Sequence, residues 1–467
     1  MNGIVKFYSD FRGYGFIEGE DGKNYFAHVS KISGSGYKTL DNDDKVIFEP
    51  RNNYKGDYAV DIRIIESNSD SLHKKQSFSL KKNPFTPQEP ISDALKFAGR
   101  KDSVFNAVDN LYNGKNILIT GARGVGKSSL AYQLLYTTAG EIDLLQKIGL
   151  DEADLFNNVI CDHRCMYGNT LLDIASGLIN TLAHRLGAND LTLSQSFGID
   201  LKVLNYSHTE TEAPINTSDI ASSFATQVEK MFVEYASDKQ GITFLIDEID
   251  TLDSYIDIAS FLKAILEKFR LDSYNNFYVI VSGVTGTITN LIAQHPSAGR
   301  LFEVIPLSKM IYDEIRELIE IHLQDTGVKI KVDALNEIVR YSNDFPQPVH
   351  LIAYHAFRID NDRCIDINDV KAAVEFIVQN LKQQEYEIKF DSLGRGKNII
   401  ALRRIVQAPY PTVSLNYLAK NGELTYDEAA GVIGELIRQG IVEKTFRNQY
   451  RLSEPLFSIY LKMVFDI

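Results

Sequence analysis

The feature that most constrains the fold of this chain is a glycine-rich stretch between an apolar run and a helical pattern. Residues 116–120 read as a buried strand, residues 121–129 contain three glycines, and residues 130–135 read as a helix. The spacing G-x-x-x-x-G-K-S is that of a loop that turns its backbone N–H groups toward a phosphate at a helix N-terminus. A chance glycine turn before a helix is the alternative. The full pattern in a strand–loop–helix context favours a nucleotide site in an α/β domain.

Each position of this loop has an expected role. Lys127 is expected to reach the β- and γ-phosphates of ATP, and the Ser128 hydroxyl to hold Mg²⁺. The other positions supply backbone N–H groups and the glycine conformations that turn these groups inward. The predicted nucleotide-binding residues are Gly121, Ala122, Arg123, Gly124, Val125, Gly126, Lys127, Ser128 and Ser129.

A second stretch carries the acidic groups that a phosphate site needs. Residues 242–246 form an apolar run that ends at Asp247 and Glu248. Asp247 is expected to hold Mg²⁺ through water, and Glu248 to polarise a water for attack on the γ-phosphate. A buried strand that runs into an acidic turn is the alternative. Together with the glycine-rich loop, these carboxylates predict an ATPase that uses ATP and Mg²⁺.

Composition limits the partners and the compartment of the chain. A length of 467 residues leaves room for several domains, and a formal net charge of −13 excludes a uniformly basic nucleic-acid surface. Cys161 and Cys165, two of only three cysteines, lack a second metal-spaced pair, which argues against zinc and fits a reduced compartment. No charged-then-apolar leader is present, and no apolar run reaches the ~18 residues of a membrane span. We expect a cytoplasmic protein with no membrane partner.

Residues 1–66 alternate apolar and polar side chains in short runs separated by turn signals. Several short strands at this spacing predict a small closed β-barrel. The period of two places Tyr14 with Phe16, and Phe26 with His28, on shared strand faces. Either these aromatic side chains stack on nucleic-acid bases, or they fill the barrel core and bind nothing. A barrel this small has room inside for few of them, which favours stacking.

Two motifs make this segment similar to the cold-shock domain family, whose members are five-stranded OB-type barrels. Residues 12–17, Arg-Gly-Tyr-Gly-Phe-Ile, and residues 25–28, Tyr-Phe-Ala-His, resemble the two nucleic-acid-binding signatures of that family. The family usually has Trp on its first strand, where this chain has Phe7. The resemblance implies binding of single-stranded DNA or RNA with little sequence preference. The residues that it assigns to nucleic-acid contact are Lys6, Phe7, Tyr14, Phe16, Phe26 and His28.

The rest of the chain divides into four further segments. Residues 67–92 are rich in Ser, Lys and Pro and predict a flexible linker. Residues 93–305 hold the glycine-rich loop and the acidic strand and predict an ATPase core, although the polar stretch 187–222 has no assigned structure. Residues 306–390 show helical periodicity and predict a helical lid. The C-terminal segment is residues 395–467.

Residues 93–390 resemble the AAA+ ATPases, especially origin-recognition-type initiators and prokaryotic signal-transducing ATPases. Phe97-Ala98-Gly99-Arg100 is similar to the element that these families place near the adenine. The resemblance implies that Ser282, at the tip of a strand, senses the γ-phosphate, unless it merely caps a turn. It also implies that Arg300 acts as an arginine finger in the site of a neighbouring subunit, with Arg270 as a rival and an ordinary exposed arginine as the alternative.

The lid departs from the initiator pattern. Residues 343–350 lack the arginine that initiators carry at this place, and His350 or Arg340 is left as a substitute. Residues 395–467 predict three helices and a hairpin, the arrangement of a winged helix, with Thr425 and Glu428 as a capping box for the third helix.

The winged helix has two open interpretations. With ten Lys and Arg against seven Asp and Glu, its charge is +3, and Arg447 and Arg451 on the wing are candidate phosphate contacts for duplex DNA. The third helix, however, carries Asp427, Glu428 and Glu435 against a single Arg438, which is poor for reading a DNA groove and fits a protein-docking module instead.

The chain as a whole reads as an ATPase of the AAA+ type with candidate nucleic-acid-binding modules at both ends. An alternative is a nucleotide-operated switch that recruits a partner effector in a prokaryotic signalling or defence system. A passive nucleic-acid-binding protein with a vestigial ATPase is a third reading, against which the intact Lys127 and Asp247–Glu248 set argues. We expect a homo-oligomer or a partner effector protein in addition to nucleic acid.

Overall fold

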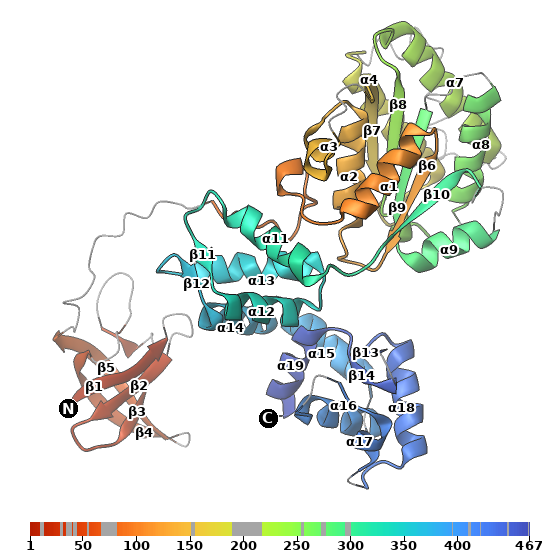
Figure 1. Cartoon of the computed structure of the whole chain (residues 1–467). Helices are drawn as coiled ribbons and strands as arrows, with labels where there is room; N and C mark the ends of the chain where they lie inside the picture. The colour runs from red at the N-terminus through yellow and green to blue at the C-terminus, as the bar shows by residue number, and fades with distance from the viewer. Residues whose placement is uncertain are drawn as a thin grey trace, which may run out of the picture. The chain divides into compact units, whose positions relative to one another are not determined.

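The structure is a computed structural model, and it separates into two units, residues 1–82 and residues 83–467. The chain is multidomain, with a small β-barrel, a parallel α/β core and a mainly helical C-terminal half (Figure 1). The described residues are 1–9, 14–28, 31–33, 40, 44–53, 56–66, 82–150, 155–188, 217–253, 256–271, 277–294, 300–394, 396–409, 412–420, 422–445, 448–465 and 467.

The first unit is a closed barrel of five strands in the order β1-β2-β3-β5-β4. The strands alternate inward and outward residues: Ile17 and Ala27 are fully buried, whereas Phe16 and Phe26 are 42% and 37% exposed. Because the core is filled by other side chains, the interpretation that Phe16 and Phe26 fill the barrel is wrong. The strands are β1 (Asn2–Ser9), β2 (Tyr14–Gly19), β3 (Asn24–His28), β4 (Lys45–Asn53) and β5 (Gly56–Glu66).

The centre of the second unit is a parallel sheet of five strands in the order β10-β6-β9-β8-β7. Side chains alternate between its two faces, as in β6, where Leu118 joins one buried cluster and Ile117 and Ile119 join another. Both faces are therefore covered, which explains why the strands read as continuous apolar runs. The strands are β6 (Asn116–Gly121), β7 (Asn158–Arg164), β8 (Gly241–Asp247), β9 (Phe277–Gly283) and β10 (Phe302–Leu307).

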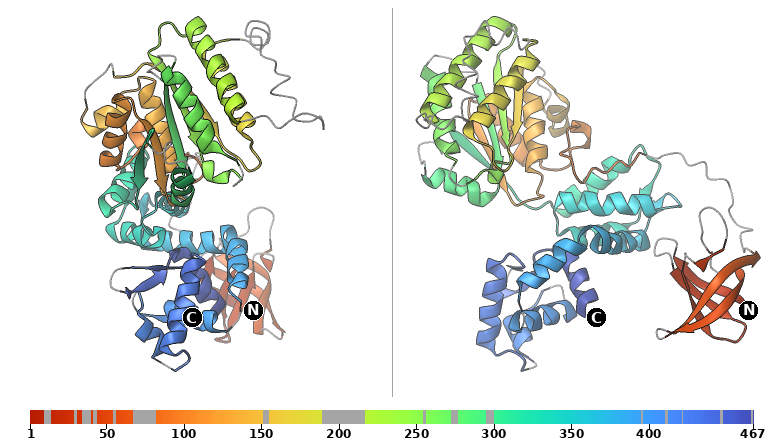
Figure 2. Two further views of the ribbon diagram at one scale, coloured as in Figure 1. Left: turned by 90° about the vertical axis from the view of Figure 1, so that its right-hand side faces the viewer. Right: turned by 180° about the vertical axis from the view of Figure 1, so that it is seen from behind.

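Helices cover both faces of this sheet, as the views in Figure 2 show. On one face lie α1 (Lys101–Tyr112), α2 (Lys127–Thr138) and α3 (Asp143–Ile148). On the other lie α4 (Leu171–Arg185), α7 (Thr217–Tyr235), α8 (Ile258–Leu271) and α9 (Thr285–Gln294). The end of the unassigned stretch 187–222 belongs to α7, and residues 189–216 lie outside the described residues.

The helices after β10 share one buried core that runs from the lid into the C-terminal segment. The third helix of that segment begins with the predicted capping box of Thr425 and Glu428. Helices α15 and α19 were not expected. The elements are α11 (Tyr312–Leu323), β11 (Lys329–Ile330), α12 (Val332–Ser342), α13 (Pro346–Ile359), β12 (Cys364–Ile365), α14 (Ile367–Phe376), η4 (Ile377–Leu381), α15 (Gln383–Ser392), α16 (Lys397–Gln407), α17 (Leu415–Ala419), α18 (Tyr426–Arg438), β13 (Val442–Lys444), β14 (Tyr450–Leu452) and α19 (Pro455–Phe465).

Residues 83–92, which we call the strap, differ from the predicted flexible linker over 67–92. Phe85 is only 1% exposed and belongs to the buried core of the lid. The backbone N–H of Ile91 donates to the Ser129 hydroxyl on α2, at 3.0 Å. A Pro- and Ser-rich composition therefore did not prevent specific contacts, because one aromatic side chain anchors the segment. None of the described helices is long and apolar enough to cross a membrane.

Candidate functional site

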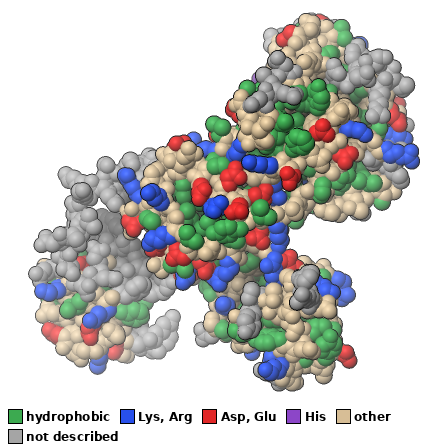
Figure 3. All heavy atoms as spheres, in the orientation of Figure 1, with side chains coloured by type: hydrophobic (Ala, Val, Ile, Leu, Met, Phe, Trp, Pro, Cys, Tyr) green, Lys and Arg blue, Asp and Glu red, His purple; other side chains and the backbone are tan. Residues whose placement is uncertain are grey.

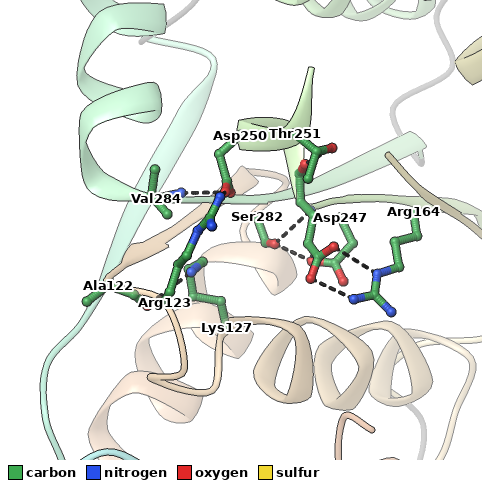
Figure 4. A network of polar contacts seen from close by, with 10 residues as sticks. Ala122, Arg123, Lys127, Arg164, Asp247, Asp250, Thr251, Ser282 and Val284 are labelled. Carbon is green, nitrogen blue, oxygen red and sulfur yellow. Dashed lines mark hydrogen bonds and ion pairs between the residues drawn. The ribbon is translucent and has the colours of Figure 1, made fainter. Parts of the chain in front are cut away.

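A cavity of about 460 Å³ lies where the carboxyl ends of the parallel strands meet the lid and the strap. The loop after β6, the acidic tip of β8 and the end of β7 all line it, because parallel strands bring their carboxyl ends to one edge of a sheet. Figure 4 shows Lys127, Asp247, Ser282 and Arg164 grouped closely together, with Arg123 extending toward Asp250. The predicted loop and the predicted acidic strand are thus brought into one site.

The glycine-rich loop has the conformation that its sequence requires. Gly124 and Gly126 have φ angles of 74° and 97°, a left-handed region that side chains rarely adopt, and Gly126 caps the N-terminus of α2. Lys127 is largely buried, and its Nζ donates to the carbonyl of Ala122 at 3.1 Å. Burial lowers the pKa of Lys127, although the nearby carboxylates of Asp250, Asp247 and Glu248 oppose that effect. An incoming polyphosphate would stabilise the charged lysine in the same way.

Asp247 stands at the centre of the polar contacts. Its side chain is 1% exposed, and its Oδ1 accepts hydrogen bonds from the hydroxyls of Ser128, at 3.1 Å, and Ser282. Burial raises the pKa of Asp247, and the two hydroxyl hydrogen bonds partly offset this. Ser282, predicted as a γ-phosphate sensor, lies at the tip of β9 and is fully buried beside Asp247.

The oxygens around Asp247 fit a magnesium ion. Mg²⁺ prefers hard oxygen ligands and usually takes one or two from protein and the rest from water and phosphates. The Ser128 hydroxyl and the Asp247 carboxylate supply such oxygens side by side. Within the described part of the chain, no cluster of three or more His, Cys, Asp or Glu side chains could hold a metal alone. A metal here would therefore depend on the nucleotide for the rest of its shell.

Glu248 is held by a partner that the sequence did not reveal. Arg164, at the end of β7, donates from Nε to Glu248 Oε2 at 2.9 Å and from Nη2 to Oε1 at 2.8 Å. This bidentate pair raises the pKa of Arg164 and engages both oxygens of the predicted catalytic carboxylate. Glu248 has a φ angle of 59°, a backbone conformation that is uncommon for residues other than glycine.

Arg100 ties three parts of the site together. Its guanidinium is buried and donates to the carbonyls of Ser308, at 2.6 Å, and Val125, at 3.0 Å, while its backbone N–H donates to Glu314. Burial lowers the pKa of Arg100, an effect that Glu314 opposes. The family resemblance predicted that this arginine lies near the nucleotide, but it did not predict its hydrogen-bond partners. It joins the glycine-rich loop to the start of the lid.

Part of the cavity is lined by apolar side chains. Phe97, Met310 and Leu318 line it together with strap residues 86–91 and His350. A planar base fits walls of this kind.

Neither candidate replaces the missing lid arginine. His350 is buried, and burial lowers its pKa to about 3, so the ring is neutral at pH 7. Arg340 pairs with Glu337 at 2.9 Å and with the Tyr341 hydroxyl, outside the residues that line the cavity. At this place the lid has Gln347, whose backbone N–H donates to the carbonyl of Gly124 at 3.3 Å.

Arg300, which was predicted to act on a neighbouring subunit, is not among the residues that line the cavity. Arg300 is exposed in the turn before β10. Arg270 lies on α8, and its side chain is outside the described residues.

The barrel carries the predicted nucleic-acid residues on neighbouring strands. The register pairs Phe7 with Phe16 and Phe16 with Phe26, and it pairs Tyr14 with His28. The Phe16 and Phe26 rings meet edge to face at 5.9 Å, and the Phe26 and His28 rings stack at 6.4 Å. Lys6 forms an ion pair with Glu18 at 2.6 Å. The side chains of Phe7 and Tyr14 lie outside the described residues.

Comparison with known proteins identifies the family to which the barrel belongs. A family model described as the "'Cold-shock' DNA-binding domain" matches residues 1–65. Cold shock protein 1 of Lactiplantibacillus plantarum is 43% identical over 61 residues, which are 13% of this chain and 92% of that protein. The chain belongs to the cold-shock domain family. The cold-shock domain is thus its first unit, and the exposed Phe16 and Phe26 lie within the matched range.

Beyond the cold-shock domain, the chain is similar to solved structures only in a general way. The Walker-type ATPase of Pyrococcus abyssi is 14% identical with a TM-score of 0.48, over 80% of this chain and 99% of that one. The ORC2 protein of Aeropyrum pernix gives the same identity and TM-score, over 79% of this chain and 92% of that one. The fold of the core is given by its own strand order, β10-β6-β9-β8-β7.

The C-terminal hairpin of β13 and β14 is fixed to the start of the lid. Glu443 accepts from Arg451 at 2.6 Å and from Lys309 at 3.3 Å, and Asn343 donates to the carbonyl of Ser453. Arg451, a candidate phosphate contact, is therefore already engaged, and Arg447 lies outside the described residues. On the face drawn in Figure 3, basic and acidic side chains of the second unit are interspersed rather than gathered in one patch.

Proposed function

We propose that the chain binds and hydrolyses ATP in an AAA+-type core and contacts single-stranded nucleic acid through its cold-shock domain. The observation that carries the first part is the convergence of Lys127, Ser128 and the buried Asp247 at one edge of a parallel sheet. A buried carboxylate beside a hydroxyl, with a lysine on a glycine-rich loop, has the chemistry to hold a metal-bound polyphosphate. The apolar end of the cavity would take the base.

Each residue of the site has its own proposed role in this reaction. The loop N–H groups and Lys127 bind and orient the phosphates, and Ser128 with Asp247 would hold Mg²⁺, which supplies charge neutralisation when bound. Glu248 is placed to accept a proton from an attacking water once its carboxylate leaves Arg164. Ser282, bound to Asp247, positions that carboxylate. The lid and the strap exclude water from the base end.

Nucleic-acid binding is assigned to the outward aromatic face of the cold-shock domain. The exposed rings of Phe16 and Phe26 offer a stacking surface, and each stacked base contributes about 1–3 kcal/mol. The ion pair of Lys6 with Glu18 leaves the face with less local positive charge than the sequence alone indicated, so stacking carries more of the affinity.

Replacing Phe16 and Phe26 together by Ala is expected to weaken single-strand binding by about 30-fold or more, since two stacking contacts are lost. ATP binding should be unchanged, because these rings lie in the separate first unit. Fluorescence anisotropy with a labelled oligonucleotide measures the first, and nucleotide titration the second. Ile47→Ala, which removes another exposed apolar side chain of the barrel, is the control. Equal single-strand affinity in the double variant would show that the two rings do not bind bases.

The function as a whole is tested by steady-state ATP hydrolysis. The purified chain is assayed alone and with single-stranded DNA, RNA or duplex DNA. We expect Mg²⁺-dependent hydrolysis that a single strand stimulates. Absence of nucleotide binding would remove the proposed function entirely. Stimulation by duplex DNA alone would move the nucleic-acid site from the cold-shock domain to the C-terminal segment.

One observation favours a second function. Arg164 engages both carboxylate oxygens of Glu248, and the lid supplies no arginine among its described cavity residues. A site in this state would hold ATP and turn it over slowly. The alternative is therefore a nucleotide-operated switch that recruits a partner effector in a prokaryotic signalling or defence system. Slow turnover with tight ATP retention and no response to nucleic acid would support it.

The remaining assignments extend this proposal. We divide the chain into a cold-shock barrel (1–66), an ATPase core (93–305), a lid (306–390) and a winged helix (395–467), although the last two share one buried core. The element order of α16, α17, α18 and the β13–β14 hairpin fits a winged helix.

Homo-oligomerisation would give Arg300 a neighbouring site to enter. Because Arg451 is paired with Glu443, protein docking suits this segment better than duplex DNA.

A further inference from the structure

One end of the strap is buried in the lid. The side chain of Asn83 donates to the carbonyl of Tyr354 on α13 at 2.9 Å. Phe85 is 1% exposed, and its ring stacks on that of His322 at 5.4 Å with an interplanar angle of 13°. The ring also meets His350 edge to face at 6.0 Å. Phe85 therefore belongs to the core that the lid shares with the C-terminal segment.

The other end of the strap is bound to the helix of the phosphate loop. The N–H of Ile91 donates to the Ser129 hydroxyl at 3.0 Å. Gln133, which is 2% exposed, donates from Nε2 to the carbonyls of Ile91 and Ser92, both at 2.9 Å. Ser129 and Gln133 lie on α2, which starts at Lys127. The strap thus joins the lid to the helix that positions the phosphate-binding lysine.

Between these anchors, residues 86–90 form a wall of the nucleotide cavity. The N–H of Thr86 lies 3.4 Å from Nδ1 of His350, and the Gln347 side chain lies 3.5 Å from the carbonyl of Pro87. Both lid residues line the cavity as well. The wall is therefore built by the strap and the lid together, and it changes if either moves.

The strap is too short to let the lid swing freely. Five residues separate Phe85 from Ile91, so the six Cα–Cα steps between them span at most about 20–22 Å when fully extended. Pro87 and Pro90 restrict its backbone further, which reduces the entropy lost when it is held in place. If the lid rotates away from α2 beyond that length, Phe85 must leave its buried site.

We propose that Phe85 is a positioning residue for nucleotide binding: by seating the strap in the lid, it closes the base end of the cavity and retains the bound nucleotide. This inference rests on the proposed function, because it concerns the same cavity. Phe85 lines neither the phosphate end nor the base end itself. Its effect falls on affinity and release, and the reacting groups Lys127, Asp247 and Glu248 stay in place.

The role of Phe85 is tested by measuring, in a stopped-flow experiment, how fast the full chain releases a fluorescent ATP analogue. Phe85→Ala is expected to speed release by about tenfold or more and to raise KM by a similar factor, with kcat within about twofold. Phe85→Leu, which refills most of the buried volume, should restore slow release. Phe105→Ala is the matched control, since that phenylalanine is 51% exposed on α1.

The outcomes separate this proposal from the function on which it rests. Unchanged release and KM in a folded Phe85→Ala protein overturn the role of Phe85 and leave the nucleotide site intact. A fall in kcat with KM unchanged also overturns it. A wild-type chain that binds no nucleotide overturns both. If Phe85→Ala does not fold, Gln133→Met removes the two hydrogen bonds that Gln133 donates to the other end of the strap, at similar volume, and release that stays slow in that variant counts against the proposal.

Discussion

Lys127→Ala is expected to reduce ATP affinity by at least about 100-fold. Hydrogen bonds to charged groups contribute roughly 1.5–3 kcal/mol each, and the buried ammonium of Lys127 is the cation at the start of α2 that would meet the phosphates. Among the described residues its Nζ donates only to the carbonyl of Ala122, a contact that a phosphate ligand could replace. Isothermal titration with ATP and Mg²⁺ measures the change.

The control for this variant is Lys115→Ala, which removes an exposed lysine just before β6. Thermal melting should show that both variants fold, since the Lys127 ammonium donates one hydrogen bond within the described residues and adds no apolar side chain to the core. ATP affinity that is the same in Lys127→Ala and wild type would remove the phosphate site from this loop.

Glu248→Gln is expected to lower kcat by about 10²–10⁴-fold while ATP affinity changes less than about threefold. Glutamine has the shape of glutamate and can still accept one hydrogen bond from Arg164, but it cannot take a proton from water. Lys127, Ser128 and Asp247, which are proposed to bind the phosphates and the metal, keep their contacts. Single-turnover hydrolysis, with the protein in excess over ATP, measures the chemical step.

Glu320→Gln, an exposed change of the same kind on α11, controls for the loss of one charge. If the wild type hydrolyses ATP readily and Glu248→Gln does so at the same rate, Glu248 has no catalytic role. A wild-type rate as slow as that of the variant would instead indicate that Arg164 keeps the carboxylate inactive, as the switch interpretation requires.

Short-range patterns predicted much of this chain. The glycine-rich loop was readable because strand, turn and helix follow one another directly between Asn116 and Thr138. Phe16 and Phe26 were readable because a barrel strand alternates its faces, and the helix at Tyr426 because a capping box is local. Helices α15 and α19 were missed: the first is weakly amphipathic, and the second is apolar on most sides, so neither shows a clear 3.6-residue period.

The sequence by itself determined which groups could do chemistry: Lys127, Ser128, Asp247 and Glu248 stand in local patterns that only a phosphate site explains well. The tertiary structure decided how these groups are restrained. Arg164 lies 84 residues from Glu248, and Asn83 lies 271 residues from Tyr354, so no local pattern links them. The neutral state of His350 likewise depends on its burial against Phe85 and His322. Contacts of this kind form only when distant segments pack together, because burial and pairing are properties of the folded core.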